Sequence, residues 1–547
     1  MDWDKIKKAR QRLSREKGTV IKDWGGRIPI ALIYPNSYYI GMSNLGFHSI
    51  YKLFNSYSEV VCERAFWERE NGAGQLPTLS LESQRPLSDF AVLAFSINYE
   101  LDYFNVVQIL KSSGIPVYAA DRDERHPLVI AGGPCIMANP LPLSPFFDCL
   151  CIGEAEPIIP AILPVLSEGI GGKRNELLKE LALIPGIYVA SAYSGVPVVR
   201  QWASSLDDFP VATSIITPDT ELGDLYLMEV ERGCNRGCRF CLTSNAFCPM
   251  RYRSIDTLIT QAKLGLKYRR RIGLVGPAVS DYPQLNELLV ELRQMGAGLS
   301  ISSLRVKPLS STVLRELAGG GARTITLAPE AGSQRLRQVI RKSVSEDDIL
   351  ESIGRVAEAG IKQLKLYFII GLPSETDEDI EGIINLTLSG KSILDRQQTG
   401  CRLSLNIAPF VPKAGTPFQW LPMASLNTLN RRLSLLKNNL APKGIKVNSE
   451  SPAWSQVQGV LARGDIKLAE VLAGIEQVSI AGWRKAVERC HLDVDYYVHQ
   501  RWDASEKLPW DIFDLGTEPG QLETELYKAL AQVGNDDSQI LSPFDRI

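Results

Sequence analysis

Short apolar runs alternate with helical segments along most of this chain, and this alternation limits its possible folds more than any other feature. In the first half the runs are residues 28–34, 90–95, 128–131 and 149–152, with helical segments such as 47–54 and 103–110 between them. Short, fully apolar strands separated by helices are typical of a parallel sheet that is covered on both faces. The first half therefore predicts an α/β domain with a doubly wound, Rossmann- or flavodoxin-like sheet.

The second half repeats the alternation between about residues 215 and 440. The predicted strands are residues 225–230, 272–276, 300–305, 324–328, 364–371 and 402–409. Ser254 precedes a helical segment at 255–266 and is its expected N-cap. Six strand–helix units form most of a barrel, and the active sites of such barrels lie at the carboxyl ends of the strands. We predict a partial (β/α)6 barrel of the TIM type.

The predicted domain organisation has four parts. Apolar residues at helical spacing among lysines and arginines predict an amphipathic helix within residues 1–27. The doubly wound domain is expected at residues 28–205 and the partial barrel at residues 206–443. Beyond them the pattern becomes mainly helical and carries several tryptophans, which predicts a small helical domain at residues 444–547.

Composition and charge exclude several classes of protein. Apolar residues make up 45% and charged residues 22% of the chain, which is ordinary for a globular protein. The net charge of -2 gives no general attraction to nucleic acid or to acidic membranes. No apolar run approaches a membrane span, and the N-terminus lacks the apolar core of a signal peptide. We expect a cytoplasmic protein with neither a membrane nor a nucleic acid as its partner.

Three of the ten cysteines have the spacing of metal ligands. Cys234, Cys238 and Cys241 are four and three residues apart, and they follow the strand predicted at 225–230. Three thiolates can hold three irons of a cubane iron–sulfur cluster, which normally takes four cysteines. The iron that is left without a protein ligand can bind a substrate, so the spacing predicts redox-initiated chemistry.

The residues around the thiols suit such a cluster. Gly233 and Gly237 allow the tight backbone that converging ligands need. Cationic neighbours favour thiolate over thiol, and cationic side chains alternate with the cysteines at Arg232, Arg236 and Arg239. A zinc knuckle and buried free cysteines remain alternatives. A structural zinc site needs four closed ligands, and Cys248 is the nearby fourth candidate because all four histidines lie far away in the sequence.

This cysteine pattern after the first strand of a partial barrel resembles the radical S-adenosylmethionine superfamily. The resemblance covers roughly residues 220–415 and includes Glu-Arg-Gly before Cys234 and Phe240 before the third cysteine. It implies a [4Fe-4S] cluster whose open iron is chelated by the amino and carboxylate groups of S-adenosylmethionine (SAM). It also implies that an electron passed to the sulfonium splits SAM into methionine and a 5′-deoxyadenosyl radical.

The same resemblance implies which residues contact SAM. Gly276-Pro277-Ala278 ends the second predicted strand, where the family commonly has a Gly-Gly-Glu-like turn that holds the methionine amine. Because Ala278 replaces the acidic residue, backbone carbonyls would have to hold the amine in this chain. Glu330 is placed for the ribose or the amino group, and residues 368–375 resemble the adenine-contacting fifth strand. The implied SAM contacts are Phe240, Gly276, Pro277, Ser303, Arg305, Glu330, Ile370 and Gly371.

Small and polar residues end each predicted strand of the first domain, and ligands of doubly wound sheets bind at that edge. Such a domain ahead of the barrel resembles the cobalamin-binding class of radical SAM enzymes. Small residues there let the backbone approach a flat macrocycle. The implied cobalamin contacts are Tyr38, Ser43, Asn44, Ser96, Asn98, Tyr99, Gly132, Gly133, Pro134, Gly153 and Glu154.

The chain departs from many cobalamin proteins after its first strand. Those proteins carry Asp-x-His-x-x-Gly, in which the histidine ligates cobalt from below. Here Ser43 takes the histidine position, and His48 lies two residues beyond Gly46. Members of the radical class often lack this histidine. We therefore expect cobalamin to bind without a protein imidazole and interpret His48 as an ordinary residue of a helix face.

The resemblance implies a cobalamin-dependent radical C-methyltransferase. One SAM would methylate the reduced cobalamin, and a second would supply the radical that removes a substrate hydrogen. The methyl group would then reach an unactivated carbon of a peptide or protein side chain or of a small metabolite. The expected partners are that substrate and an electron donor such as ferredoxin or flavodoxin. No residue is assigned as a catalytic acid or base.

Three alternatives remain. The first is a radical cyclase or oxidoreductase that transfers no methyl group. The second is a methylthiotransferase-like enzyme, although Cys62, Cys135, Cys149 and Cys151 do not match the positions of the three N-terminal cysteines of that class. The third is a non-catalytic iron–sulfur or corrinoid sensor.

Overall fold

The computed structural model describes residues 3–68, 77–301 and 303–533, so Ser302 of the third predicted barrel strand lies outside the described residues. The chain forms two compact units. The first unit comprises Met1–Tyr226, Leu461–Asp493 and Lys507–Gly516, and the second comprises Leu227–Val460, Val494–Glu506 and Thr517–Ile547. The four-part domain organisation stays a prediction.

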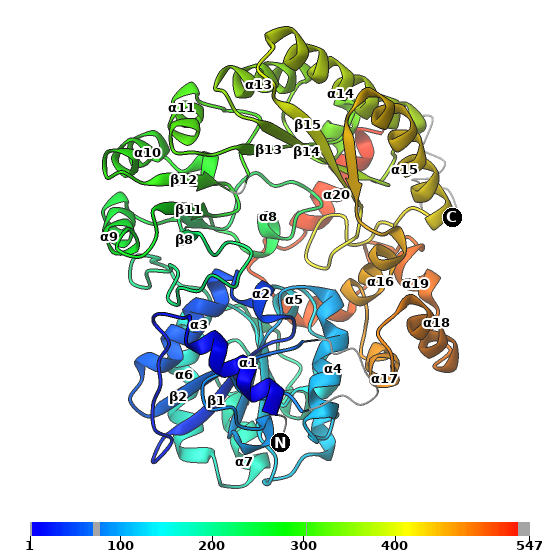
Figure 1. Ribbon diagram of the computed structural model, residues 1–547. Helices are drawn as coiled ribbons and strands as arrows, with labels where there is room; N and C mark the ends of the chain where they lie inside the picture. Colours follow the sequence, from blue (N-terminus) through cyan, green and yellow to red (C-terminus); the bar gives the residue numbers. More distant parts are fainter. Residues whose placement is uncertain (1–2, 69–76, 302, 534–547) are drawn as a thin grey trace, which may run out of the picture. The chain divides into compact units, whose positions relative to one another are not determined.

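A six-stranded sheet forms the centre of the first unit (Figure 1). Its strands are β1 (Ile28–Tyr34), β2 (Val60–Phe66), β3 (Val92–Ser96), β4 (Leu128–Gly132), β5 (Cys149–Cys151) and β6 (Ile187–Tyr188). The order is β2-β1-β3-β4-β5-β6, in which β1 to β5 are parallel and β6 is antiparallel. The order β2-β1-β3-β4-β5 is that of a flavodoxin-like sheet. The α/β class predicted from the apolar runs is therefore confirmed.

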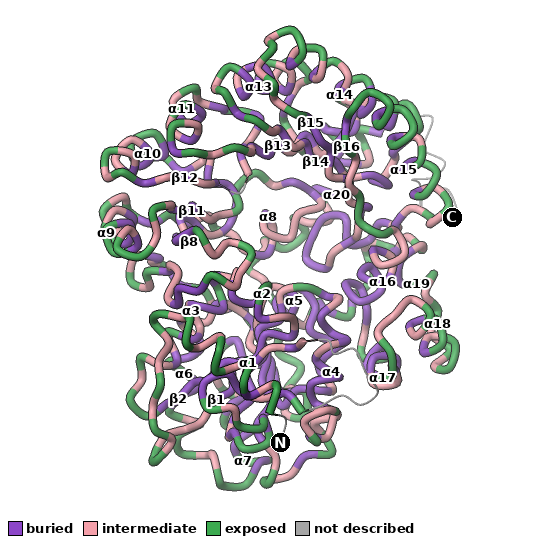
Figure 2. The backbone as a smooth tube through the Cα atoms, in the orientation of Figure 1, coloured by how far each residue is buried: buried purple, intermediate pink, exposed green. Residues whose placement is uncertain are grey.

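Helices cover this sheet because alternate strand residues point to opposite faces. On one face Ile30, Leu32 and Ile130 share a core with α3 (Leu45–Ser56), α6 (Ala155–Gly169) and α7 (Arg174–Ala182). The other elements of this unit include α1 (Trp3–Leu13), α2 (Tyr38–Gly41), α4 (Tyr103–Ser112), α5 (Pro134–Ala138), α17 (Leu468–Ala473), α18 (Ile480–Arg489), and the paired strands β7 (Val198–Val199) and β17 (Phe513–Asp514). Figure 2 shows the strands buried and the outer faces of the helices exposed.

The second unit is built from two parallel sheets that continue one another. The strands are β8 (Leu225–Glu229), β11 (Arg271–Val275), β12 (Gly298–Ile301), β13 (Thr324–Glu330), β14 (Gln363–Ile370), β15 (Arg402–Pro409) and β16 (Lys446–Ser449). One sheet has the order β12-β11-β8 and the other β13-β14-β15-β16, and a parallel bridge between Leu304 and Leu327 joins them. All six predicted barrel strands form, so these sheets make the expected partial barrel.

Helices follow the barrel strands in alternation (Figure 1). They are α9 (Ile255–Gly265), α10 (Leu285–Gln294), α11 (Ser311–Gly319), α12 (Gln334–Val339), α13 (Glu346–Glu358), α14 (Asp377–Gln397) and α15 (Leu426–Leu440). The second unit also contains most of α16 (Pro452–Ala462), together with α19 (Val494–Val498) and α20 (Gln521–Ala531). Ser254 caps α9 as predicted, because its side chain accepts the N–H of Thr257. Every helix within the described ranges is too short or too polar to cross a membrane.

Candidate functional site

The three cysteines with metal-ligand spacing lie in one loop at the carboxyl end of β8. The loop starts after β9 (Glu231–Arg232), contains the single turn α8 (Thr243–Ala246), and ends at β10 (Arg251–Tyr252). β9 and β10 pair antiparallel and close the base of the loop. Because β8 is the first strand of the partial barrel, the cysteines lie at the edge where such barrels carry their active sites.

Two glycines set the path of this cysteine loop. Gly233 has a φ of 85°, and a Cβ there would lie 2.5 Å from the carbonyl oxygen of Phe247 on the other side of the loop. Gly237 has a φ of 67°, and a Cβ there would lie 2.9 Å from the guanidinium of Arg341. Left-handed backbone and close neighbours both require glycine at these positions. The loop can therefore fold back tightly enough to bring its thiols together.

The Cys238 thiol is affected by burial and by the charges of its neighbours. Cys234 and Cys238 are buried, and Cys241 is half-buried. Burial raises the pKa of the Cys238 thiol to about 11, and the charges of Cys241, Glu330 and Cys234 raise it as well. Such a set of neighbouring thiols becomes anionic only if positive charge accompanies it. A bound metal centre would supply that charge.

The cations closest to the thiols come partly from segments outside the cysteine loop. Arg305, which the family resemblance assigned to SAM, donates to Sγ of Cys234 at 3.4 Å, and Lys342 lowers the pKa of Cys238 through its charge. Each of the three loop arginines pairs with a carboxylate. Arg236 pairs with Asp281, Arg232 with Glu229 and Arg239 with Glu525. The cationic environment predicted for the thiols is present, but it is built largely by long-range contacts.

This donor set fits a [4Fe-4S] cluster better than a single ion. Within residues 3–68, 77–301 and 303–533, no group of three or more His, Cys, Asp or Glu is arranged to hold one metal ion. In a cubane each thiolate binds a different iron, so the ligands lie further apart than those of one ion. The candidate fourth thiol, Cys248, donates to the carbonyl oxygens of Ser244 at 3.2 Å and Cys234 at 3.4 Å. These bonds favour a structural role for Cys248, which leaves three thiols for a cluster.

The remaining implied SAM contacts lie at neighbouring strand ends. Glu330 ends β13 with a φ of 70°, and its carboxylate accepts from Lys342 at 3.1 Å. A non-glycine residue held in the left-handed region is strained, and such strain often occurs at functional sites. Ile370 ends β14, and Gly371 follows with a φ of 75°. Their assignment to SAM stays a prediction, as does that of the half-buried Phe240 and Ser303.

The carboxylate of Glu231 on β9 accepts a hydrogen bond from the turn after β11. The backbone N–H of Ala278 donates to Oε1 of Glu231, and a Cβ on Gly276 would lie 2.6 Å from Cγ of Glu231. Glu231 is 1% exposed, and burial raises its pKa to about 7. The sequence motif Glu-Arg-Gly before Cys234 contains this residue, but its contact with the turn at Gly276, Pro277 and Ala278 is visible only in the folded structure.

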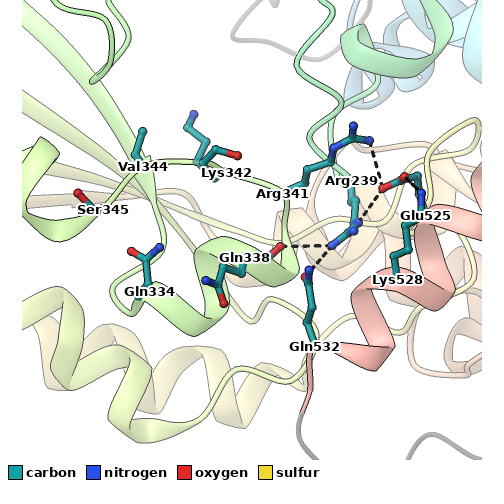
Figure 3. Close-up of a pocket in the computed structure, with 11 residues that line it drawn as sticks. Arg239, Gln334, Gln338, Arg341, Lys342, Val344, Ser345, Glu525, Lys528 and Gln532 are labelled. Carbon is teal, nitrogen blue, oxygen red and sulfur yellow. Dashed lines mark hydrogen bonds and ion pairs between the residues drawn. The ribbon is translucent and has the colours of Figure 1, made fainter.

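A pocket of about 500 Å³ adjoins the cysteine loop in the second unit (Figure 3). Glu525 on α20 lines it and accepts from three cations, Arg239 at 3.2 Å, Arg341 at 3.2 Å and Lys528 at 2.9 Å. Arg239 also donates to the carbonyl oxygen of Val339 in α12 at 2.8 Å. Since Arg239 lies between the second and third cysteines, these contacts tie α12 and α20 to the loop.

In the first unit, the implied cobalamin contacts lie in loops after β1, β3, β4 and β5. Gly133 has a φ of 113°, and a Cβ there would lie 2.5 Å from the carbonyl oxygen of Ile97, so the loops after β3 and β4 approach closely. Asn98 donates to Oγ of Ser96 at 3.4 Å, and Tyr99 is 41% exposed. The half-buried residues at this edge are Gly132, Gly133, Pro134 and Gly153.

Four other residues that the resemblance implies as cobalamin contacts form hydrogen bonds inside the first unit through their side chains. The Tyr38 hydroxyl donates to Glu16, and the Ser43 hydroxyl donates to the carbonyl oxygen of Tyr39. The side chains of the other two accept backbone N–H groups, Asn44 from Phe47 at the start of α3 and Glu154 from Ala203. These contacts give the four residues structural roles, and their part in binding cobalamin stays a prediction.

His48 on α3 is buried and held as a neutral imidazole. Its Nε2 contacts the carbonyl oxygen of Met42 at 3.0 Å, and its Nδ1 accepts from the backbone N–H groups of Ser214 and Ile215 at 3.3 Å. Burial lowers the pKa of His48 to about 4. Both ring nitrogens are used within the unit, which agrees with the interpretation of His48 as an ordinary helix-face residue.

The stability of the first unit should depend on pH through His48. Its pKa falls from 6.5 to about 4 on folding, so its contribution is complete above pH 6.5 and is lost as the pH falls toward 4. At about pH 5 the free energy of unfolding should be lower by about 2 kcal/mol because of His48. Urea unfolding measured at about pH 7.5 and about pH 5 should show a smaller decrease in the free energy of unfolding for His48→Gln than for the wild type. An equal decrease in both proteins would contradict the assignment.

Two family models match the chain. The model for "Radical SAM proteins, N-terminal" matches residues 46–190, and the model for "Radical SAM superfamily" matches residues 228–387. The first match lies within the doubly wound unit. The second begins in β8, contains the cysteine loop, and ends within α14.

Three relatives match to different extents. An uncharacterised protein of Methanocaldococcus jannaschii is 31% identical over 453 residues, which cover 81% of this chain and 90% of the relative. A Pyrococcus horikoshii protein named as an uncharacterised methyltransferase is 26% identical over 47% of this chain and 56% of its own length. A tRNA-2-methylthio-N(6)-dimethylallyladenosine synthase of Bacillus cereus is 24% identical over 60% of this chain and 63% of its own length. The chain spans less than two thirds of the last two relatives.

A solved structure of the cobalamin-dependent S-adenosylmethionine radical enzyme OxsB, with aqua-cobalamin and S-adenosylmethionine bound, is similar over 94% of this chain and 80% of that chain. Its TM-score is 0.49 and its sequence identity 12%. The matching family models and the long archaeal relative agree with a three-cysteine loop at the edge of a partial barrel. The chain belongs to the radical SAM superfamily.

Proposed function

We propose that this protein is a cobalamin-dependent radical SAM methyltransferase. The observation that carries the proposal is the loop of Cys234, Cys238 and Cys241 at the carboxyl end of β8, which offers three thiols to a cluster. These three cysteines would hold a [4Fe-4S] cluster with one iron open to SAM, which when bound would supply the electron for cleavage of the sulfonium. Membership of the radical SAM superfamily supports this assignment of the three cysteines.

The residues around the loop would position SAM and balance charge. Arg305 and Lys342 offset the negative charge of the thiolates, Arg305 by direct contact with Cys234. Glu330 lies close enough to influence the pKa of Cys238 and is paired with Lys342 at 3.1 Å, so its carboxylate is held beside the loop. Cys234 and Cys238 are buried, and fixed ion pairs beside them would orient a ligand before reaction.

The first unit would hold cobalamin at the carboxyl edge of its parallel sheet. Ligands of doubly wound sheets bind outside that edge, and here it is formed by Gly132, Gly133 and Pro134 after β4 and by Asn98 and Tyr99 after β3. Glycine brings backbone groups close to the rim of a flat macrocycle, and Tyr99 offers an exposed aromatic ring. We assign no protein imidazole to the cobalt, because both ring nitrogens of His48 are used inside the unit.

The proposed substrate is a peptide or protein side chain or a small metabolite with an unactivated carbon. An acidic one-electron carrier such as ferredoxin or flavodoxin is the proposed electron donor. All ten cysteines are free thiols, which is typical of proteins from reducing compartments, and we place the protein in the cytoplasm.

Cobalamin binding and methyl transfer can be measured separately. After anaerobic incubation with hydroxocobalamin and desalting, the protein should retain the corrinoid absorbance in near-stoichiometric amount. With methyl-labelled SAM, a substrate should gain the mass of one labelled methyl group. An iron-loaded protein that never retains the corrinoid would rule out this methyl transfer, whereas retention without a gain in mass would favour another radical outcome.

A methylthiotransferase-like activity is the second candidate, because a tRNA methylthiotransferase is among the partial relatives. The cysteines of the first unit argue against it. Cys62 lies on β2, Cys135 on α5 and Cys149 on β5, and all three are buried. Burial raises the pKa of Cys62 and of Cys149 well above the ordinary value. These thiols fit the apolar core of the sheet better than a second cluster.

A further inference from the structure

The pocket beside the cysteine loop is lined by more cations than anions (Figure 3). Among its described lining residues, four side chains are cationic and one is a carboxylate, that of Glu525. We call the cations the basic patch, and they are Arg239, Arg341, Lys342 and Lys528. All of them belong to the second unit. The chain as a whole has a net charge of -2, so this local surplus does not follow from composition and can steer an acidic partner.

Two residues of the basic patch reach into solvent. The side chains of Arg341 and Lys528 are 47% and 59% exposed, and they pair with Glu525 at 3.2 and 2.9 Å. Exposed ion pairs contribute little to stability, so both cations can exchange Glu525 for carboxylates of a partner at small cost. Glu525 keeps a partner when they do, because the buried Arg239 holds it at 3.2 Å.

The basic patch borders the proposed cluster ligand Cys238. Sγ of Cys238 lies 3.9 Å from the carbonyl oxygen of Arg341, and the backbone N–H of Arg239 donates to the carbonyl oxygen of Ile340 at 3.2 Å. Arg341 thus has its backbone against a thiol and much of its side chain in solvent. Electron transfer slows steeply with distance, so a carrier protein needs an exposed surface next to a ligand of the cluster. Arg341 provides this juxtaposition.

We infer that the basic patch is the docking surface of an acidic one-electron carrier protein, and that the electron enters past Arg341 toward Cys238. This inference rests on the proposed function, since it needs a cluster on the three cysteines. In this step the reduced carrier loses one electron and the cluster gains it, and no bond forms or breaks. Carboxylates of the carrier pair with Arg341 and Lys528, while Arg239 and Lys342 add to the attraction.

The test measures the binding of flavodoxin, as the acidic carrier, to anaerobically iron-loaded protein. The double variant Arg341→Gln with Lys528→Gln removes both exposed charges. At low ionic strength it should bind flavodoxin roughly 10-fold or more weakly than the wild type, because complementary charges speed association. At about 1 M ionic strength this difference should shrink, since salt screens such attraction. Biolayer interferometry gives the association rates and dissociation constants without turnover.

Arg315→Gln with Lys391→Gln is the matched control. It removes the same net charge from ion pairs on the surfaces of α11 and α14, and it should keep the wild-type affinity for flavodoxin. Dithionite is a small reductant that needs no docking surface. In excess it should reduce the cluster of the wild type and of both double variants to the same extent, which verifies that each carries an intact cluster.

A patch variant that binds flavodoxin as tightly as the wild type, or a control variant that weakens binding equally, would overturn the inference. So would iron-loaded wild-type protein that binds neither flavodoxin nor a ferredoxin. If Arg341→Gln disturbs the cysteine loop, Lys528→Gln on α20 should still bind flavodoxin more weakly than Arg315→Gln. Wild-type protein that binds flavodoxin but leaves SAM intact with excess dithionite would instead contradict the proposed function.

Discussion

Replacing Cys238 by alanine is expected to abolish both the iron–sulfur absorbance and the reductive cleavage of SAM. Cys238 is buried in the cysteine loop, and its thiol is influenced by Cys234 and Cys241. Removing it leaves two thiols, too few for a cubane with one open iron. Iron content should fall sharply, and formation of 5′-deoxyadenosine should drop to the level of metal-free protein.

Cys248→Ala is the matched control for this prediction. It makes the same chemical change in the same loop, ten residues from Cys238 in the sequence. Because the Cys248 thiol donates to the carbonyl oxygens of Ser244 and Cys234, its loss should cost only weak hydrogen bonds. Iron content and SAM cleavage should stay near the wild-type values. A Cys238→Ala protein with a full cluster, or a Cys248→Ala protein without one, would contradict the ligand assignment.

Arg64→Ala should destabilise the first unit by about 3–5 kcal/mol, the usual cost of breaking a buried ion pair. Arg64 lies on β2 and is fully buried. It donates to Glu82 at 2.7 Å and to Glu16 at 2.6 Å, and both carboxylates are buried as well. Its guanidinium also lies 5.0 Å from the centre of the Tyr51 ring. The variant would leave two carboxylates in the core without a cation.

Arg125→Ala provides the comparison, because Arg125 forms an ion pair with Asp123 at 2.6 Å but is 84% exposed. Exposed pairs contribute little to stability because solvent screens them. Chemical denaturation should therefore unfold Arg64→Ala at a clearly lower denaturant concentration than Arg125→Ala. If Arg64→Ala unfolds at the same denaturant concentration as Arg125→Ala, the buried network does not stabilise the fold as described.

The strands that the sequence predicted best have a regular apolar pattern. β1 (Ile28–Tyr34) has the predicted bounds because its apolar run is continuous, and β15 (Arg402–Pro409) has them because its leucines and isoleucine alternate with other residues. β2 was missed, since Glu63 and Arg64 interrupt its apolar run. Both are buried and paired with partners far along the chain, Glu63 with Trp24 and Arg64 with Glu16. Periodicity cannot reveal a charged residue that a distant partner makes compatible with the core.

The same limit applies to the candidate site. The spacing of Cys234, Cys238 and Cys241 was enough to predict a set of ligand thiols, and the fold places all three in one loop. The residues that tune them are not local: Arg305 reaches Cys234 from beyond β12, and Lys342 reaches Cys238 from beyond α12. Glu231 was overlooked for a similar reason, because its contact with the turn at Ala278 joins two different strands.

The most direct test of the central claim is the anaerobic reaction of iron-loaded protein with SAM and a low-potential reductant. We predict that 5′-deoxyadenosine and methionine appear in equal amounts, and that their formation requires each of Cys234, Cys238 and Cys241. Protein that carries a [4Fe-4S] cluster but leaves SAM intact, or that cleaves it equally well without one of these three cysteines, would contradict the account.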